Sequence, residues 1–270
     1  MKTKNIKESL RVAIVSGGAM GYRNGGPSIG GAISVRLARD GFKVVVADQL
    51  KAGQWTADRI RKNGGEAIFV RGDVTNTAFV KRLIKTAEKE FGGLTALVNC
   101  VARYGSGMAK NESEISEEEW DKTLAVNLGG YFKCAKYAIP LILKSGGGTI
   151  VNISSWGSFA SLPNFSVYTV SKAAIDGLTR SLAVDFAPKI RTNSVCPGFV
   201  KIANSENRRT PKQLKDWYGS IAKNYPLGRV CEVEEIANAV AFLSGEESSY
   251  INGQSIIVDG GKSISDRHQF

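Results

Sequence analysis

The sequence has few cysteines and no long apolar run. Its 270 residues include four cysteines, far apart and without CxxC spacing, so we expect neither a disulfide framework nor a zinc site, and no bound metal. No apolar segment approaches the roughly 18 residues that cross a bilayer, and residues 1–10 form a basic tail without the apolar stretch of a secretion signal. We therefore expect a cytoplasmic protein that binds no membrane, with reduced thiols at Cys100, Cys134, Cys196 and Cys231.

Acidic residues are outnumbered by basic ones. The formal charge of +11 and the pI near 9.5 are typical of proteins that bind nucleic acid or anionic surfaces. The basic residues are spread along the chain, however, and no nucleic-acid motif or basic arm gathers them. A solvated basic surface is the favoured interpretation, and no nucleic-acid partner is expected.

A glycine-rich loop, residues 16–31, follows the first apolar run at 11–15. After the loop, apolar residues recur at helical spacing over 29–40, and a second apolar run at 42–47 ends at Asp48. This order of a strand, a glycine loop, a helix and a second strand that ends in an acidic residue is typical of dinucleotide sites. Glycines let the backbone approach the pyrophosphate, and the helix N-terminus offers free N–H groups. The segment therefore predicts a nucleotide site.

The same alternation continues to the end of the chain. Further strands are expected at 67–70, 94–98, 149–153, 192–195 and 254–258, with helices at about 55–63, 76–90, 117–142, 166–186 and 233–243. This order predicts an α/β single-domain, doubly wound Rossmann fold over residues 11–261, with a parallel sheet of about seven strands and helices on both faces. Residues 262–270 form a C-terminal tail. Ligands are expected beyond the carboxyl ends of the strands.

One helix start carries a pair of residues suited to acid/base chemistry. Tyr168 and Lys172 are four residues apart, so they lie on one face of the expected helix. A free phenol, with a pKa of about 10, is a poor base at neutral pH, and a nearby ammonium lowers that pKa. Ser155, at the end of the preceding strand, could hold a substrate oxygen beside the phenol.

Several ordered motifs resemble those of the short-chain dehydrogenase/reductase family, over nearly the whole of residues 11–261. The glycine motif TGxxxGxG is approximated by residues 16–30, NNAG by residues 99–102, and the ending of the family by residues 251–261. Single residues also match: the acid at Asp48, the adenine contact at Asp73 and Val74, the active-site Asn127 and Ser155, the YxxxK pair, and the turn at Pro197, Gly198 and Val200.

The resemblance implies an enzyme that interconverts a secondary alcohol and a ketone by hydride transfer. It implies that Tyr168 exchanges a proton with the substrate oxygen and that Ser155 orients this oxygen. It also implies that Lys172 lowers the tyrosine pKa and binds the nicotinamide ribose, while Asn127 positions a water in the proton relay. The hydride belongs to the cofactor.

The implied cofactor is NAD. Asp48 would accept hydrogen bonds from the adenosine ribose and repel the 2′-phosphate of NADP. The other implied contacts lie in the glycine loop and at the strand ends: Gly17, Gly21, Arg23, Ser28, Ile29, Gly30, Asp73, Val74, Asn99, Tyr168, Lys172, Pro197, Gly198 and Val200.

The resemblance also implies a homotetramer and a substrate cover formed by residues 201–229. This segment holds more basic than acidic residues, which indicates either an anionic alcohol or ketone substrate or an exposed, charged helix.

The glycine loop departs from the family pattern by an insertion, Tyr22 to Ser28. Extended loops also occur in enoyl reductases of the same superfamily, but their YxxMxxxK motif is absent. We expect the insertion to clamp the cofactor diphosphate through Arg23, since a cation about 4 Å from a phosphate gains roughly 1 kcal/mol or more. An exposed flap without contacts is the alternative.

Two other functions remain open. Residues 26–30 match the GxSxG pattern of α/β-hydrolases, with Ser28 as nucleophile and His268 as its base. The serine lies too far after the strand for a nucleophile elbow, and His268 lies in a polar tail. A non-catalytic NAD-binding sensor is the other alternative, although such a protein would normally lack the Tyr or the Lys.

Overall fold

The chain forms a single seven-stranded parallel sheet. The computed structural model describes residues 10–21, 26–104, 110–161, 163–203 and 209–265. The strand order β3-β2-β1-β4-β5-β6-β7 confirms the doubly wound Rossmann fold. The strands are β1 (Val12–Ser16), β2 (Lys43–Asp48), β3 (Ala67–Arg71), β4 (Ala96–Asn99), β5 (Gly148–Ile153), β6 (Ile190–Pro197) and β7 (Ser255–Val258).

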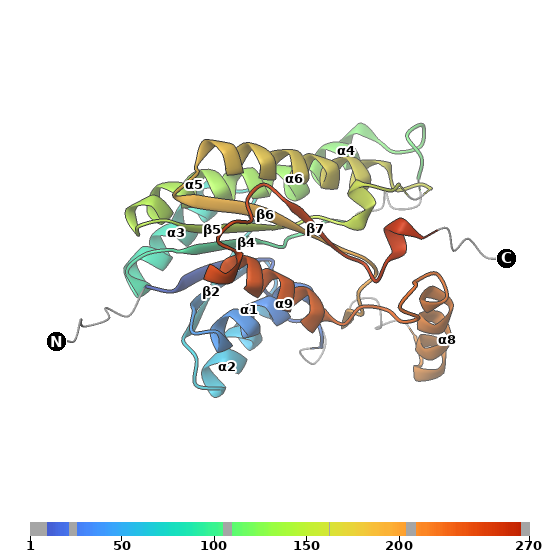
Figure 1. Ribbon diagram of the computed structural model, residues 1–270, viewed down its shortest axis with the longest axis horizontal. Coiled ribbons are helices and arrows are strands. Elements are labelled where there is room, and N and C mark those ends of the chain that lie inside the picture. The colour runs from blue at the N-terminus through green and yellow to red at the C-terminus, as the bar shows by residue number, and fades with distance from the viewer. Residues whose placement is uncertain (1–9, 22–25, 105–109, 162, 204–208, 266–270) are drawn as a thin grey trace.

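Helices cover both faces of the sheet (Figure 1). One face packs against α1 (Ile29–Arg39), α2 (Gly53–Lys62) and α9 (Val233–Ser244), and the other packs against α3 (Thr77–Phe91), α5 (Gly130–Lys144) and α6 (Ser166–Asp185). The central strands β1, β2, β4, β5 and β6 are largely buried on both sides, and β1 is completely inaccessible, whereas the edge strands β3 and β7 are partly exposed. This explains why the strands appear in the sequence as continuous apolar runs rather than as alternating patterns.

The strand order reverses beside β1. Ser16 at the end of β1 pairs with Ala47 of β2 on one side and with Asn99 of β4 on the other. The connections after β1 and β4 therefore leave the sheet in opposite directions, which opens a crevice at the carboxyl ends of these strands. The glycine loop leaves the sheet at this point.

The helix predicted over residues 117–142 is interrupted. The structure has α4 (Glu117–Leu124), a π-helical turn (Ala125–Gly129) and then α5. Asn127 lies in the turn, where its Oδ1 accepts the Arg103 N–H at 2.7 Å and its Nδ2 donates to the Arg103 carbonyl at 3.1 Å. A single π-helical turn within a helix often marks a functional site, and this one ties the helix to the segment after β4.

The segment predicted to cover the substrate contains α8 (Pro211–Ala222), which stands apart from the sheet and its helices (Figure 1). Thr210 and Gln213 form a capping box at its start, and none of its residues is buried. Its Trp217 packs edge-on against Phe199 after β6, with ring centroids 5.2 Å apart. Aromatic contacts rather than a buried core hold this helix near the sheet.

The described part of the chain shows neither a membrane-spanning helix nor a cluster of metal ligands. None of its helices has both the length and the apolar character of a membrane span. Within the same residues, no group of three or more His, Cys, Asp or Glu side chains could hold a metal ion. The four cysteines are free thiols.

Candidate active site

A cavity of about 970 Å³ lies at the carboxyl edge of the sheet. The ends of five strands, the glycine loop and the first turn of α6 form its walls. Most of the residues predicted for the site line it: Gly17, Gly21, Ser28, Ile29, Gly30, Asp48, Asp73, Val74, Ser155, Tyr168, Lys172, Pro197, Gly198 and Val200. The sequence motifs therefore converge on one site.

The glycine loop is tightly packed. Gly17 has φ +75°, and a Cβ on Gly30 would lie 1.9 Å from the Gly17 carbonyl oxygen. Only glycine fits this approach of the loop to the start of α1. The loop thus presents bare backbone and a helix N-terminus to the cavity, as a pyrophosphate site requires.

Ser28 is the N-cap of α1. Its hydroxyl accepts the Gly31 N–H at 3.1 Å and donates to the Ala19 carbonyl at 2.6 Å. The serine therefore closes the loop onto the helix, and it does not lie on a sharp turn directly after a strand. This geometry argues against the hydrolase alternative. His268, the proposed partner, lies outside the described residues.

Asp48 ends β2 and faces the cavity. Its carboxylate accepts the Ala19 N–H at 3.1 Å and the Leu50 N–H at 3.0 Å. Burial raises the pKa of this carboxyl, and the backbone hydrogen bonds oppose that effect. Asp48 thus joins the glycine loop to β2 and places an acid at the position expected for a ribose contact.

The insertion is bonded to the segment that follows β6. Residues 22–25, including Arg23, lie outside the described part of the chain, so the phosphate clamp stays a prediction. At the base of the insertion, the Gly21 N–H donates to the Gly26 carbonyl at 3.0 Å. The Pro27 carbonyl accepts the Ala203 N–H at 2.8 Å, which connects the cofactor loop to the predicted substrate cover.

Ser155, Tyr168 and Lys172 meet at the cavity. Ser155 lies two residues after the end of β5, and its hydroxyl accepts the Gly157 N–H at 3.1 Å. Ser155 also hydrogen-bonds to Tyr168, and this contact lowers the tyrosine pKa. Burial has a larger, opposite effect, so the pKa of Tyr168 is raised well above its usual value. The phenol is therefore protonated at neutral pH.

Lys172 is almost completely buried, with 2% of its surface exposed. Its Nζ donates to the Ile153 carbonyl at 2.9 Å and lies 5.7 Å from the centre of the Tyr168 ring. Burial lowers the lysine pKa to about 8. The predicted effect of Lys172 on the Tyr168 pKa stays a prediction: burial of the phenol raises this pKa, and the lysine Nζ donates its hydrogen bond to a carbonyl.

Asn99 and Asn127 are fully buried and do not line the cavity. Asn99 accepts the Ser16 hydroxyl at 3.2 Å and donates to the Asn152 side chain at 2.9 Å. It therefore holds the ends of β1, β4 and β5 together behind the cavity, and its predicted contact with the cofactor stays a prediction. Asn127 holds the Arg103 backbone, and its predicted part in a water relay stays a prediction.

Sequence reasoning missed several aromatic residues of the cavity. The Tyr104 ring stacks on Tyr168, with centroids 5.4 Å apart and planes 19° apart, and Phe165 meets Tyr168 edge-on at 6.3 Å. Trp156 and Phe199 also line the cavity. None belongs to a motif, and the only signal was their position just after a motif or a strand end.

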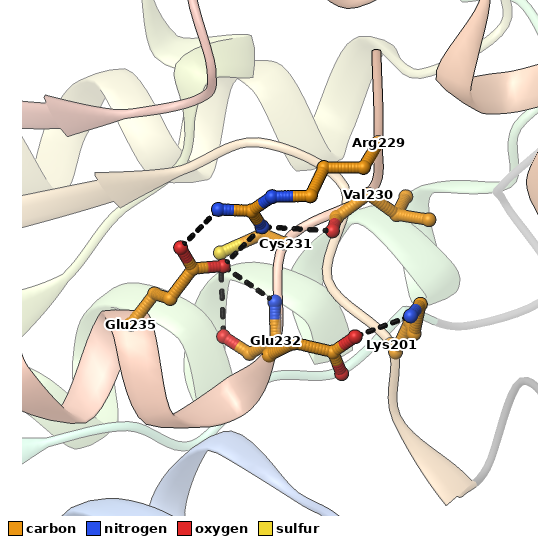
Figure 2. A network of polar contacts seen from close by, with 6 residues as sticks. All are labelled: Lys201, Arg229, Val230, Cys231, Glu232 and Glu235. Atoms are coloured by element: carbon orange, nitrogen blue, oxygen red, sulfur yellow. Dashed lines mark hydrogen bonds and ion pairs between the residues drawn. The ribbon is translucent and has the colours of Figure 1, made fainter. Parts of the chain in front are cut away.

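The basic residues at the two ends of the predicted cover pair with α9 and its N-cap (Figure 2). Lys201 forms an ion pair with Glu232, and Arg229 binds both carboxylate oxygens of Glu235, at 2.6 and 2.7 Å. The arginine holds the pKa of Glu235 down to about 2. No described basic residue of 201–229 lines the cavity, so this segment supplies no evident site for an anion.

Comparisons with known proteins agree with the motifs. A family model described as enoyl-(acyl carrier protein) reductase matches residues 25–263. An uncharacterized oxidoreductase of Thermotoga maritima is 39% identical, with coverage of 87% of this chain and 93% of that protein. Cyclohexanol dehydrogenase of Acinetobacter sp. is 33% identical, with coverage of 96% and 97%.

Among solved structures, an actinorhodin polyketide ketoreductase with NADPH is similar at a TM-score of 0.85 and 28% identity, with coverage of 94% of this chain and 98% of that chain. The chain belongs to the short-chain dehydrogenase/reductase family. It is an oxidoreductase that acts on hydroxyl groups with a nicotinamide cofactor.

Proposed function

We propose that the protein is an NAD-dependent dehydrogenase/reductase that interconverts a secondary alcohol and a ketone through Tyr168. The observation that carries this proposal is the meeting of Ser155, Tyr168 and Lys172 at one cavity with the glycine loop and Asp48. The loop suits a dinucleotide, because side chains are excluded where the pyrophosphate would approach. When bound, the nicotinamide would supply or accept the hydride.

The protein's own residues handle the oxygen and its proton. Ser155 orients the substrate oxygen beside the phenol. Tyr168, protonated at neutral pH, donates its proton to the oxygen when a ketone is reduced. In the oxidation, Tyr168 must first lose this proton, and a charged Lys172 one turn away favours the phenolate. The protonated phenol is the form that reduction of a ketone requires.

NAD is proposed over NADP because of Asp48. A carboxylate at the end of β2 can accept hydrogen bonds from ribose hydroxyls and repels a phosphate at the same place. Its backbone partners, Ala19 and Leu50, keep it pointing along the cavity wall. A homotetramer and a cytoplasmic location stay predictions, the first of which light scattering would test.

We propose a neutral, ring-shaped substrate. The outer part of the cavity has aromatic walls, formed by Tyr104, Trp156, Phe165 and Phe199. Arg103, which also lines it, is paired with Glu119 at 2.9 Å. Aromatic walls favour apolar ring compounds over anions, and one relative is named for its action on cyclohexanol.

The test is turnover of Tyr168→Phe with a panel of cyclic alcohols and ketones. We expect a loss of at least about 100-fold in kcat, as removal of a general acid/base typically causes, while NAD affinity measured by fluorescence stays within about twofold. Tyr250→Phe, whose side chain is fully exposed, is the matched control. Near-normal turnover by Tyr168→Phe would refute the assignment, and NAD binding without any turnover by the wild type would favour the sensor.

A further inference from the structure

Tyr104 contacts the proposed acid/base directly, although no motif contains it. Its ring is nearly parallel to that of Tyr168, and a hydrogen bond joins the two hydroxyl groups. Among the described residues, Ser155, Phe165 and Lys172 also lie against the Tyr168 side chain. Tyr104 therefore contacts both the ring and the hydroxyl group of Tyr168.

We propose that Tyr104 is a positioning residue that holds the Tyr168 phenol through ring stacking and sets, through its hydroxyl group, the pH range in which Tyr168 exchanges a proton. The proposal rests on the function assigned to Tyr168 above. Stacking of two aromatic rings favours the paired orientation of the phenol by about two- to tenfold beyond the effect of burial. The hydroxyl contact acts on the same atom that must gain and lose the proton.

The backbone before Tyr104 is firmly held. Asn127 binds both the N–H and the carbonyl of Arg103, at 2.7 and 3.1 Å, and Glu119 of α4 binds the Arg103 guanidinium at 2.9 Å. Tyr104 is the next residue, so the π-helical turn fixes where its ring begins. The buried Asn127, which does not line the cavity, is thereby connected to Tyr168 through Arg103 and Tyr104.

Several groups face Tyr168 from the elements packed around it. They are Ser155 after β5, Tyr104 and Cys100 after β4, Tyr131 on α5, and Lys172 on α6 itself. Arg103, which is paired with Glu119 of α4, lines the same cavity. The hydrogen bond from Ser155 lowers the pKa of Tyr168, whereas the Tyr104 contact and Cys100 raise it. The Tyr104 hydroxyl therefore favours the protonated phenol, and its removal should favour the phenolate.

Tyr104→Phe separates the two roles, because it keeps the ring and removes the hydroxyl. We expect the pH of half-maximal kcat for alcohol oxidation to move to lower pH, corresponding to a change of about five- to tenfold in the proton affinity of Tyr168. Tyr104→Leu should show the same shift together with a loss of kcat at all pH values. If ring stacking holds the phenol, kcat should be higher in Tyr104→Phe than in Tyr104→Leu, while the pH range stays shifted in both variants.

A second readout does not depend on turnover. Ultraviolet titration of tyrosinate absorbance follows Tyr168 when each curve is corrected by that of the same protein carrying Tyr168→Phe in addition. The corrected curve should show the same shift in Tyr104→Phe and none in Tyr250→Phe. If the wild type turns over its substrate and neither readout moves, or if rates fall equally at every pH, the proposal for Tyr104 is wrong. Absence of wild-type turnover on all substrates contradicts the proposed function instead, and the titration still tests Tyr104.

Discussion

Replacement of Lys172 by methionine should stabilise the protein while it impairs catalysis. Lys172 is a buried amine whose pKa falls from 10.5 to about 8. Each tenfold change in proton affinity corresponds to about 1.4 kcal/mol, so at neutral pH the buried charge costs about 3 kcal/mol relative to an exposed lysine. Methionine has a similar length and carries no charge, which removes this penalty.

The hydrogen bond lost with the amine reduces the gain. The Nζ donates to the Ile153 carbonyl at 2.9 Å, and a bond of this kind contributes about 1 kcal/mol. The carbonyl does not become unpaired, because the Tyr131 hydroxyl also lies 3.0 Å from it. The expected net increase in the free energy of unfolding is therefore about 2 kcal/mol at pH 7.

The pH dependence distinguishes this explanation from a simple packing effect. Between pH values of about 8 and 10.5 the unfolded chain binds a proton at Lys172 that the folded chain does not, so wild-type stability rises with pH in this window. The advantage of Lys172→Met should be full below pH 8 and disappear above 10.5. Urea denaturation of both proteins at one concentration, from pH 7 to 10, measures the difference. A variant that is less stable at pH 7, or a difference that is independent of pH, would refute the reasoning.

Two further substitutions test the cofactor wall. Asp48→Ala should shift the ratio of kcat/KM values towards NADP by about tenfold or more, because a like charge near the 2′-phosphate is removed. Asp48→Asn, which keeps a hydrogen-bond acceptor, is the matched control. A wild-type preference for NADP would contradict the role of Asp48. Ser28→Ala should lower the free energy of unfolding by about 1 kcal/mol through loss of the α1 N-cap. Urea denaturation measures this change, with Ser28→Thr, which keeps the hydroxyl, as the control. Equal stability of the wild type and both variants would show that the cap contributes nothing.

The sheet could be predicted from the sequence because its central strands are buried on both faces. Such strands must be apolar throughout, so runs such as residues 43–48 are visible without an alignment. The break at Ala125–Gly129 could not be predicted in the same way. Helical periodicity continues across it, and its cause is a tertiary contact between Asn127 and the backbone of Arg103.

In the site, too, features set by local sequence could be predicted, whereas features set by tertiary contacts could not. Glycines, Asp48 and the Tyr168–Lys172 pair are determined by local spacing and chemistry, and the structure brings them together. Sequence spacing places an ammonium near Tyr168, but it does not reveal the burial of the phenol, which raises the tyrosine pKa. Tyr104 was missed for the same reason: its importance depends on a ring contact between the segment after β4 and the start of α6.

The buried amine and the protonated phenol have a common origin. Lys172 is buried and Tyr168 is half-buried beside it, so the uncharged form of each is favoured: the tyrosine pKa rises and the lysine pKa falls to about 8. A lysine with a pKa of about 8 is partly neutral near physiological pH, and small changes around it can shift its charge. Burial of Lys172 therefore costs stability at neutral pH, while it leaves an ionisable amine beside the proposed acid/base.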